Sequence, residues 1–504
     1  MKINKKLIII LSGITFMCTS CRDWLDIKPE DEVYGKDLFS SYRGFKDALN
    51  GCYMALADCN AYGERLTMSN VESLAAQWNL TSDYYRKADY YFLHHNYTRD
   101  DAKNAIKTIY SQLFNVITPG EYDYRSLRAI WQQHCGSGES CHDRRRSVWH
   151  TRVLPLDILR LFGQLPQNAT LTVSLPYSES ADIKIMPVYY SFEDYVKKLD
   201  EDLDKACSLL KDYDLIFKYT FDQLNTPSNI NLNDDYLAYR QLHFNYWGVK
   251  ALKARLYLYI GDVTKAHDNA MEIINAKGAD GKSLMKLSGR EDLLKGLYAC
   301  PSECLLAIHK YNLRDYSPTV LGGDADRKIN PSEQLCLNGT WNLQRLFTGF
   351  SITSHNRYIY QWELNTESSS NGQKFPTLKK YYSKYSSDND MVKGQIIPLL
   401  RISELYLIAM ETTTSLEEAN ALYKEYMASH DISISAEDSF TSLDAVANFM
   451  LAEYQREFYA EGVMFYQYKR RNSTSMTFLF GETMNEGLYV LPLPETEYNP
   501  NAIQ

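Results

Sequence analysis

Glycine and proline are scarce in this chain, at 24 and 15 of its 504 residues. Together with a hydrophobic content of 45%, this scarcity excludes collagen-like, low-complexity and disordered chains. Positive charge is in deficit as well, with 54 Lys and Arg against 63 Asp and Glu, a net charge of -9. Because binding a phosphate backbone needs clustered positive charge, we expect no nucleic-acid partner. A sugar, a peptide or a protein is the expected partner.

Familiar catalytic motifs are also missing. The sequence contains no GxSxG, GxxxxGK[ST] or HExxH pattern. Glu453 and Glu457 stand at the spacing of a general acid and base on one helical face, but with Arg456 between them they are interpreted as surface charge or as salt-bridging groups. The adjacent residues His94 and His95 cannot present both rings on one helical face. We therefore expect no enzymatic activity, no cofactor and no metal.

The ten cysteines have no paired spacing typical of a disulfide framework. Cys52 with Cys59, and Cys300 with Cys304, could form bridges in an oxidising compartment. Buried free thiols are the preferred interpretation, because an unpaired cysteine behaves as a small hydrophobic residue.

The N-terminus combines three lysines, an apolar run over residues 7–16 and a pair of small residues before Cys21. This order predicts an export signal peptide over residues 1–20, because the apolar run is too short to span a bilayer. A cysteine directly after such a site is typical of lipoproteins, in which its sulfur carries a diacylglycerol. We therefore predict that Cys21 is the lipid anchor of a mature body over residues 21–504. Asp23 and Asp26, close behind it, favour display at the cell surface.

Helical periodicity dominates the rest of the chain, so the predicted fold class is all-α, an irregular helical body with tetratricopeptide-like hairpins and long surface loops. Residues 245–274 contain two apolar seams separated by Gly261-Asp262, which predicts such a hairpin. Tyr257 and Tyr259 are expected in its core. Residues 401–426 predict a second hairpin. Further helices are expected over 41–57, 192–210 and 449–469, and long loops over 225–233 and 312–374.

Several pieces of sequence are shared with one known family, in the same order and over nearly the whole chain. They are CRDWLDIKP from Cys21, LDILRLFGQLP from Leu156, IPLLRISE from Ile397, EYQREFYAEG from Glu453 and LPLPE from Leu491. The chain thereby resembles the SusD/RagB family of outer-membrane nutrient-binding lipoproteins. The resemblance implies an all-helical, lipid-tethered body that caps a SusC-like TonB-dependent outer-membrane channel. It implies delivery of oligosaccharides, or sometimes peptides, without catalysis.

Between residues 118 and 154 the helical periodicity is lost, and tryptophan and consecutive arginines stand where an apolar stripe is expected. One interpretation is a zinc site with two histidine and two cysteine ligands, His134, Cys135, Cys141 and His142. Their spacing matches no common zinc module. A one-base shift of reading frame can restore helical periodicity and family-like pieces over residues 119–153, so we favour a frameshifted segment. We expect that residues 119–153 do not form the helices that the resemblance implies.

Tyrosine is unusually frequent, with 40 residues beside 19 Phe and 7 Trp. Flat rings can stack on the apolar faces of sugars while polar neighbours bond to the hydroxyls. We expect the ligand surface on exposed aromatic residues in two loop-like regions that also resemble, in chain order, the regions from which the family builds its binding face. Packing into the core is the alternative for any one of these residues. The candidates are Trp78, Tyr84, Tyr85, Trp341, Tyr358, Tyr360 and Trp362.

Two other functions compete with the ligand-binding lipoprotein. A tetratricopeptide scaffold for protein partners would present a concave groove lined by repeat helices. A surface glycosidase or peptidase would need a carboxylate pair or a nucleophile in a deep cleft.

Overall fold

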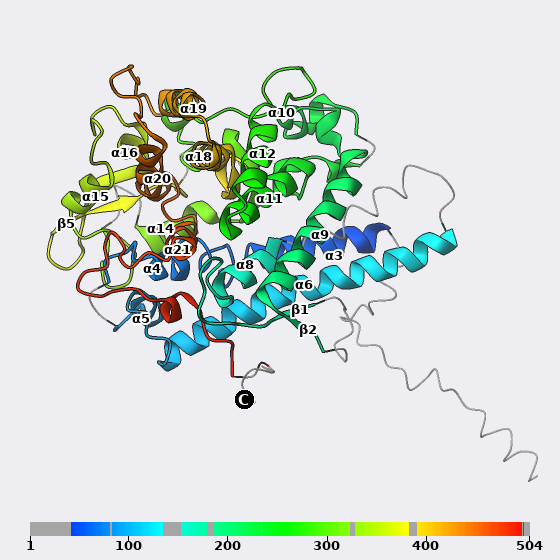
Figure 1. The fold of residues 1–504 in the computed structure, drawn as a ribbon, viewed down its shortest axis with the longest axis horizontal. Coiled ribbons are helices and arrows are strands. Elements are labelled where there is room, and N and C mark those ends of the chain that lie inside the picture. Colours follow the sequence, from blue (N-terminus) through cyan, green and yellow to red (C-terminus); the bar gives the residue numbers. More distant parts are fainter. Residues whose placement is uncertain are drawn as a thin grey trace, which may run out of the picture.

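The computed structural model describes residues 42–80, 83–134, 153–178, 186–232, 234–322, 328–382, 391–495 and 497. Within these ranges the chain is mainly α-helical, as predicted, with three two-stranded sheets (Figure 1). The predicted anchor Cys21, the signal peptide and the zinc candidates Cys135, Cys141 and His142 lie outside the described residues. In the described part of the chain, no helix has the length and apolar character needed to cross a membrane.

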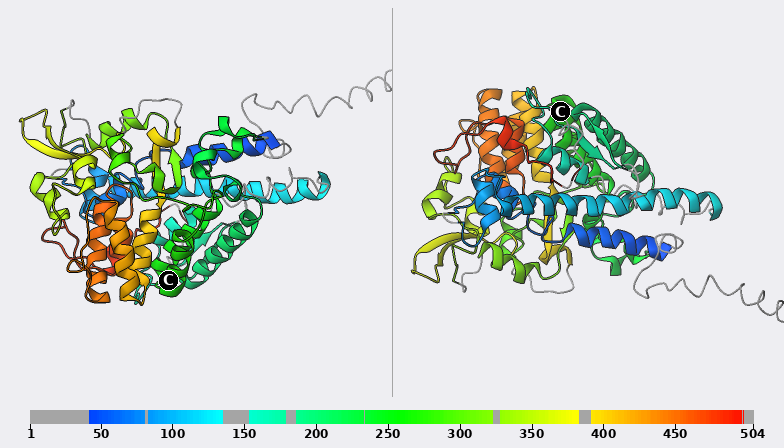
Figure 2. Two further views of the ribbon diagram at one scale, coloured as in Figure 1. Left: turned by 90° about the horizontal axis from the view of Figure 1, so that it is seen from above. Right: turned by 90° about the horizontal axis from the view of Figure 1, so that it is seen from below.

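The first helices are α3 (Tyr42–Leu56), α4 (Asn70–Leu74), α5 (Lys87–Leu93) and α6 (Asp100–His134). α3 packs along α6, and the far end of α6 projects beyond the body (Figure 2). The expectation that helix is lost after residue 118 is wrong as far as His134, because α6 continues to that residue. Good helix formers after residue 120 allow the packed first half of α6 to propagate. The frameshift interpretation itself stays a prediction.

The next elements surround the helix predicted over 192–210. They are α8 (Val153–Phe162), the antiparallel strands β1 (Leu175–Tyr177) and β2 (Val188–Tyr190), and α9 (Phe192–Lys211). α9 confirms the prediction, and it buries an apolar seam that includes Tyr195 and Leu199. It begins at Ser191, whose hydroxyl accepts from the backbone N–H of Asp194 at 3.2 Å and so caps the helix.

Two helix hairpins form the centre of the fold, as predicted. They consist of α11 (Tyr246–Ile260) with α12 (Val263–Ile274), and α18 (Ile402–Thr412) with α19 (Leu416–Ala428). Gly261 ends α11 with a φ of 83°, in the left-handed region that favours glycine. α12 packs on α18, so the two hairpins stack. Tyr257 and Tyr259 are buried, as expected.

The helix predicted over 449–469 is in fact two helices, α20 (Leu443–Glu457) and α21 (Met464–Arg470). The chain turns at Gly462, where φ is 69° and a Cβ atom would lie 1.9 Å from the carbonyl oxygen of Leu66. The turn also presents the carbonyl of Ala460 to the hydroxyl of Tyr381, at 2.7 Å. The break therefore depends on contacts with residues distant in sequence, which helical periodicity cannot reveal.

Residues 312–374 contain regular elements, so the prediction of one long loop is wrong. The elements are α14 (Leu313–Leu321), α15 (Thr340–Leu346), α16 (Asn356–Gln361), β4 (Trp362–Glu367) and the first residue of β5 (Lys374–Leu378). β4 pairs antiparallel with β5, with Trp362 opposite Leu378. Elements this short, separated by Asn, Ser and Gly, carry too little periodicity to be predicted from sequence.

The remaining elements are the pair β3 (Cys304–His309) and β6 (Ile396–Arg401) and several short helices. These helices are η3 (Leu215–Phe217), α10 (Phe221–Leu224), η4 (Pro227–Asn229), η5 (Asp235–Leu237), η6 (Arg240–Leu242), α13 (Arg290–Leu294), η7 (Pro301–Glu303), α17 (Met391–Gly394) and η8 (Glu486–Tyr489). One hydrophobic cluster runs from α3 to α21 through both hairpins. Cys52, Cys300 and Cys304 are buried free thiols, which confirms the preferred interpretation for them, whereas Cys59 is free but only half-buried.

Candidate functional site

Tyr84 and Tyr85 form an exposed aromatic pair just before α5. The two residues are 71% and 54% exposed, and their rings meet edge to face with centroids 4.6 Å apart at an angle of 78°. Both were predicted as ligand residues. Two large aromatic rings that are exposed to solvent offer apolar faces that a ligand can cover.

A hollow of about 280 Å³ opens beside this pair. Its polar groups are held in place by one another. Arg86 pairs with Glu64 at 3.0 Å, Arg65 donates to Asn70 Oδ1 at 2.7 Å, and the hydroxyl of Tyr316 donates to Glu64. Hydrogen-bonding groups next to flat rings can bind a ligand that is apolar on one face and polar at its rim. The hollow is lined by Cys59, Glu64, Arg65, Ser69, Asn70, Tyr85, Arg86, Lys87, Ala88, Asp89 and Asp101.

Trp341 lies in the first turn of α15 and is 65% exposed. The guanidinium of Arg345, one turn later, lies over its ring, 4.9 Å from the centroid. Phe478 and Phe480 face the same guanidinium at 5.8 Å and 5.6 Å. Sequence reasoning missed these three partners. The i,i+4 spacing of Trp341 and Arg345 is a local signal for the first contact, whereas the contacts of Phe478 and Phe480 depend on the tertiary fold.

The two exposed aromatic groups lie at one end of the molecule. α5 and α15 are both at the end away from the projecting tip of α6 (Figure 1). The segment that carries Phe480 reaches α5, because Glu482 pairs with His94, directly after α5, at 2.6 Å. We call this end, defined by Tyr84, Tyr85, Trp341, Arg345 and Phe480, the aromatic end.

Four of the predicted ligand residues are not exposed in this way. Trp78 and Trp362 are 2% and 3% exposed, and each packs edge-on against Tyr459 with a centroid distance of 5.1 Å. Tyr358 is buried, and Tyr360 is half-buried. The expectation of exposed rings at Trp78, Tyr358 and Trp362 is wrong, because a ring enclosed by core neighbours has no free face for a ligand.

A larger hollow of about 720 Å³ lies between α10, residues 278–289 and α13. Its wall carries both charges, for example Asp222, Glu291 and Lys282. The described residues that line it include no tyrosine or tryptophan. The aromatic side chain among these lining residues is Phe221, which is only 6% exposed, whereas the rings at the aromatic end are exposed to solvent. The aromatic end is therefore the stronger candidate for binding the apolar face of a ligand.

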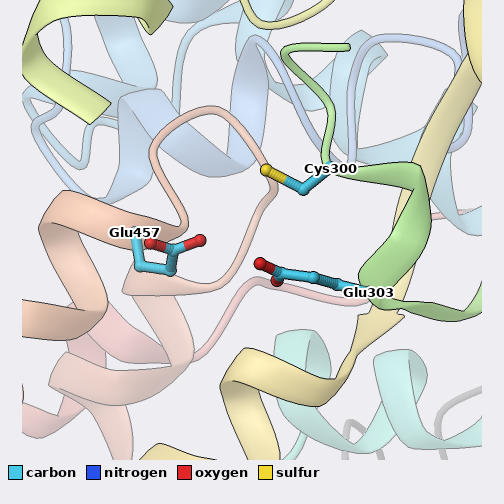
Figure 3. A group of neighbouring side chains, drawn as sticks. All are labelled: Cys300, Glu303 and Glu457. Carbon is cyan, nitrogen blue, oxygen red and sulfur yellow. The ribbon is translucent and has the colours of Figure 1, made fainter. Parts of the chain in front are cut away.

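A cluster of buried charged side chains lies where α16, β6 and the end of α20 meet. Cys300, Glu303 and Glu457 converge there (Figure 3). Both carboxylates are already paired, because Arg357 contacts them at 3.1 Å and 3.0 Å and Arg401 contacts each at 2.6 Å. Burial raises the pKa of the Cys300 thiol to about 12, and the thiolate is the form that ligates metals. These groups serve the ion-pair cluster, and we assign no metal to them.

The predicted acid pair belongs to the same cluster. Glu453 and Glu457 are fully buried, so their interpretation as surface charge is wrong and the salt-bridging alternative is confirmed. Glu457 also contacts His430 Nε2 at 2.8 Å. Although burial opposes it, the guanidinium groups of Arg357 and Arg401 hold the pKa of Glu457 well below its usual range. An enclosed carboxylate that is ionised and paired is unsuited to proton transfer with a substrate.

The described fold is similar to several solved structures, whereas no family model and no curated protein matches the chain. A SusD superfamily protein from Bacteroides thetaiotaomicron aligns with a TM-score of 0.66 and 18% identity, over 91% of this chain and 98% of that one. A protein from Bacteroides vulgatus to which sugar binding is assigned by inference aligns with a TM-score of 0.62 and 17% identity, over 86% of this chain and 89% of that one. Surface glycan-binding protein A from Bacteroides uniformis aligns with a TM-score of 0.63 and 13% identity, over 90% and 96%. The chain therefore has the helical fold of the SusD superfamily.

Proposed function

We propose that the chain is a nutrient-binding lipoprotein of the cell surface that binds an oligosaccharide at the aromatic end. A lipid on Cys21 would tether it to the outer membrane, where it would deliver its ligand to a SusC-like TonB-dependent channel. The observation that carries the binding role is the exposed pair Tyr84 and Tyr85 beside a polar hollow. Structural neighbours named as sugar-binding and glycan-binding proteins support it.

The geometry of the aromatic pair suits a sugar. A sugar ring has an apolar face of C–H groups and a rim of hydroxyls, so one tyrosine ring can cover the face while neighbouring side chains bond to the rim. The two rings are inclined at 78° to each other, so they offer two differently oriented surfaces. This arrangement favours an oligosaccharide whose successive rings are not coplanar. Arg65, Arg86 and Asn70 supply hydrogen-bonding groups beside it.

The proposed role involves no catalysis. The acid pair of α20 is enclosed in the ion-pair cluster, and in the hollow beside the aromatic pair Glu64 and Asp89 are both paired with Arg86. Incubation of the protein with a bound oligosaccharide should return the intact ligand, as measured by chromatography. New reducing ends in that experiment, absent from a protein-free control, would contradict a purely binding role.

A tetratricopeptide scaffold is the second candidate, favoured by the stacked hairpins. The chain itself covers part of this stack. The hydroxyl of Tyr257 on α11 donates to Asp200 on α9 at 2.7 Å, and Arg255 donates to Glu404 on α18 at 2.7 Å. These contacts occupy the helix faces that a scaffold would offer to a partner, so ligand binding at the aromatic end is preferred.

Isothermal titration calorimetry with the mature protein tests the proposal. The ligand panel should contain neutral oligosaccharides, acidic oligosaccharides and short peptides. We expect saturable binding of at least one oligosaccharide. Binding of peptides alone, or of no ligand in the panel, would contradict the proposed function.

A further inference from the structure

The guanidinium of Arg345 has an unusual environment for a charged group. Three aromatic rings surround it, those of Trp341, Phe478 and Phe480, at 4.9 to 5.8 Å from their centroids. Within the part of the chain that the structure describes, this guanidinium forms neither a hydrogen bond nor an ion pair. The aromatic rings attract the cation, but they do not neutralise it or accept its N–H donors in the plane of the group.

The contrast with Arg357 shows what is missing. Arg357 donates to Glu303 and Glu457, and its charge is fully compensated inside the core. Arg345 has three rings in place of carboxylates. The acidic residue that lies two positions beyond Phe480, Glu482, pairs with His94 at 2.6 Å. The N–H donors of the planar Arg345 guanidinium can therefore bind a carboxylate or a sulfate, the groups whose geometry matches that of a guanidinium.

The neighbours of Arg345 also supply a surface for the rest of such a ligand. Trp341 and Phe480 are 65% and 67% exposed. α15 fixes this surface on the core, because Leu343 and Leu346 are buried and Arg456 donates to the carbonyl of Leu346 at 2.8 Å. A ligand that meets an unpaired guanidinium between two exposed rings must carry an anionic group next to an apolar face.

We infer that the ligand of the aromatic end is an acidic oligosaccharide, one that bears uronic acid carboxylates or sulfate esters, and that Arg345 binds its anionic group. This inference rests on the proposed function, because it names the chemical class of the same ligand. With a net charge of -9 the protein repels polyanions in general, so a local cation is needed to bind one.

The test compares acidic oligosaccharides with their neutral counterparts by isothermal titration calorimetry. The pairs are oligogalacturonate with its methyl ester, and chondroitin sulfate and heparin oligosaccharides with forms from which either the sulfates or the uronate carboxylates, but not both, have been removed. We expect the protein to bind one of the acidic ligands and to lose at least about tenfold in affinity when the charge is removed. The two kinds of pair distinguish a carboxylate from a sulfate. Affinity should also fall with added NaCl.

The substitution Arg345→Met keeps the apolar stem and removes the charge. It should weaken binding of the acidic ligand at least about tenfold and reduce its salt dependence, with the melting temperature unchanged. Arg290→Met is the matched control, because that arginine is exposed, pairs with Asp431 and is not one of the residues that define the aromatic end, so its loss should leave affinity unchanged. Equal affinity for acidic and neutral forms, selective binding of neutral glycans, or an unaffected Arg345→Met variant would overturn the inference and leave the proposed function standing. Failure to bind any oligosaccharide would overturn both.

Discussion

The guanidinium of Arg357 donates to the carboxylate of Glu457 at 3.0 Å, and neither side chain is exposed. The pair joins α16 to the end of α20, a hundred residues later in the chain. Arg401 at the end of β6 binds the same carboxylate at 2.6 Å. An ion pair removed from water stabilises a fold only when its partners are all present, so these residues hold three distant elements in one arrangement.

Glu457→Gln should destabilise the protein strongly. The substitution leaves the charges of Arg357 and Arg401 undercompensated in the core, which costs about 3–5 kcal/mol of the free energy of unfolding. Urea denaturation followed by circular dichroism measures it. Glu417→Gln, on the exposed side of α19, should change that free energy by less than about 0.5 kcal/mol. A loss for Glu457→Gln no larger than for this control would contradict the role of the cluster.

Glu72 should make stability fall as pH rises. Burial raises its pKa to about 8, although the backbone N–H of Gly462 donates to it at 2.7 Å. Since its pKa in the folded state lies above that of the unfolded chain, the folded protein binds more protons between about pH 4.5 and 8, and stability is lost across that range. Glu72→Gln removes this dependence. As the pH rises through this range, the variant should become more stable relative to the wild type, by up to about 1.4 kcal/mol in the free energy of unfolding per pH unit. A constant difference from pH 5 to 8 would show that Glu72 does not titrate there.

Trp362 and Trp341 should respond in opposite ways to truncation. Trp362→Ala removes a buried ring packed on Tyr459 and should cost about 3–5 kcal/mol of stability. Trp341→Ala removes an exposed ring and should cost less than about 0.5 kcal/mol. Thermal or urea unfolding of the two variants compares them directly. Equal stability losses would mean that the burial of one tryptophan and the exposure of the other are misassigned.

The proposed lipid anchor has its own test. Metabolic labelling with a palmitate analogue should mark the protein, and Cys21→Ala should abolish the mark. Cys59→Ala, which removes a half-buried thiol of the folded body, should leave labelling unchanged. Labelling that survives Cys21→Ala would eliminate this anchor.

The sequence predicts the elements whose signal is local. The seams of α9 and α12 repeat every three to four residues, so periodicity alone locates these helices. α11 is buried on nearly every side, and its limits are marked by Asn245, which caps its start, and by Gly261, which ends it. The break between α20 and α21 is not predictable in this way, because it depends on how closely Gly462 approaches Leu66. Apolar periodicity also fails to predict that α6 continues beyond residue 118. There the helix propensity of the residues outweighs the loss of the apolar pattern.

The candidate site is predictable only in part, for a related reason. Tyr85 and Trp78 stand in similarly polar sequence, yet Tyr85 is exposed and Trp78 packs on Tyr459. The residue that buries Trp78 is more than 350 positions away, so composition cannot separate the two cases. The same holds for Arg345, whose contact with Phe480 appears only in the folded chain.

The affinity of the double variant Tyr84→Ala/Tyr85→Ala for the oligosaccharide identified by calorimetry tests the central claim most directly. Because both rings are exposed, the variant should fold with an unchanged circular dichroism spectrum and melting temperature. Tyr213→Ala, two residues beyond the end of α9, is the control for the loss of a partly exposed tyrosine. The account predicts an affinity at least about tenfold lower for the double variant and unchanged for the control. Equal affinity of the double variant and the wild type would contradict ligand binding at the aromatic end.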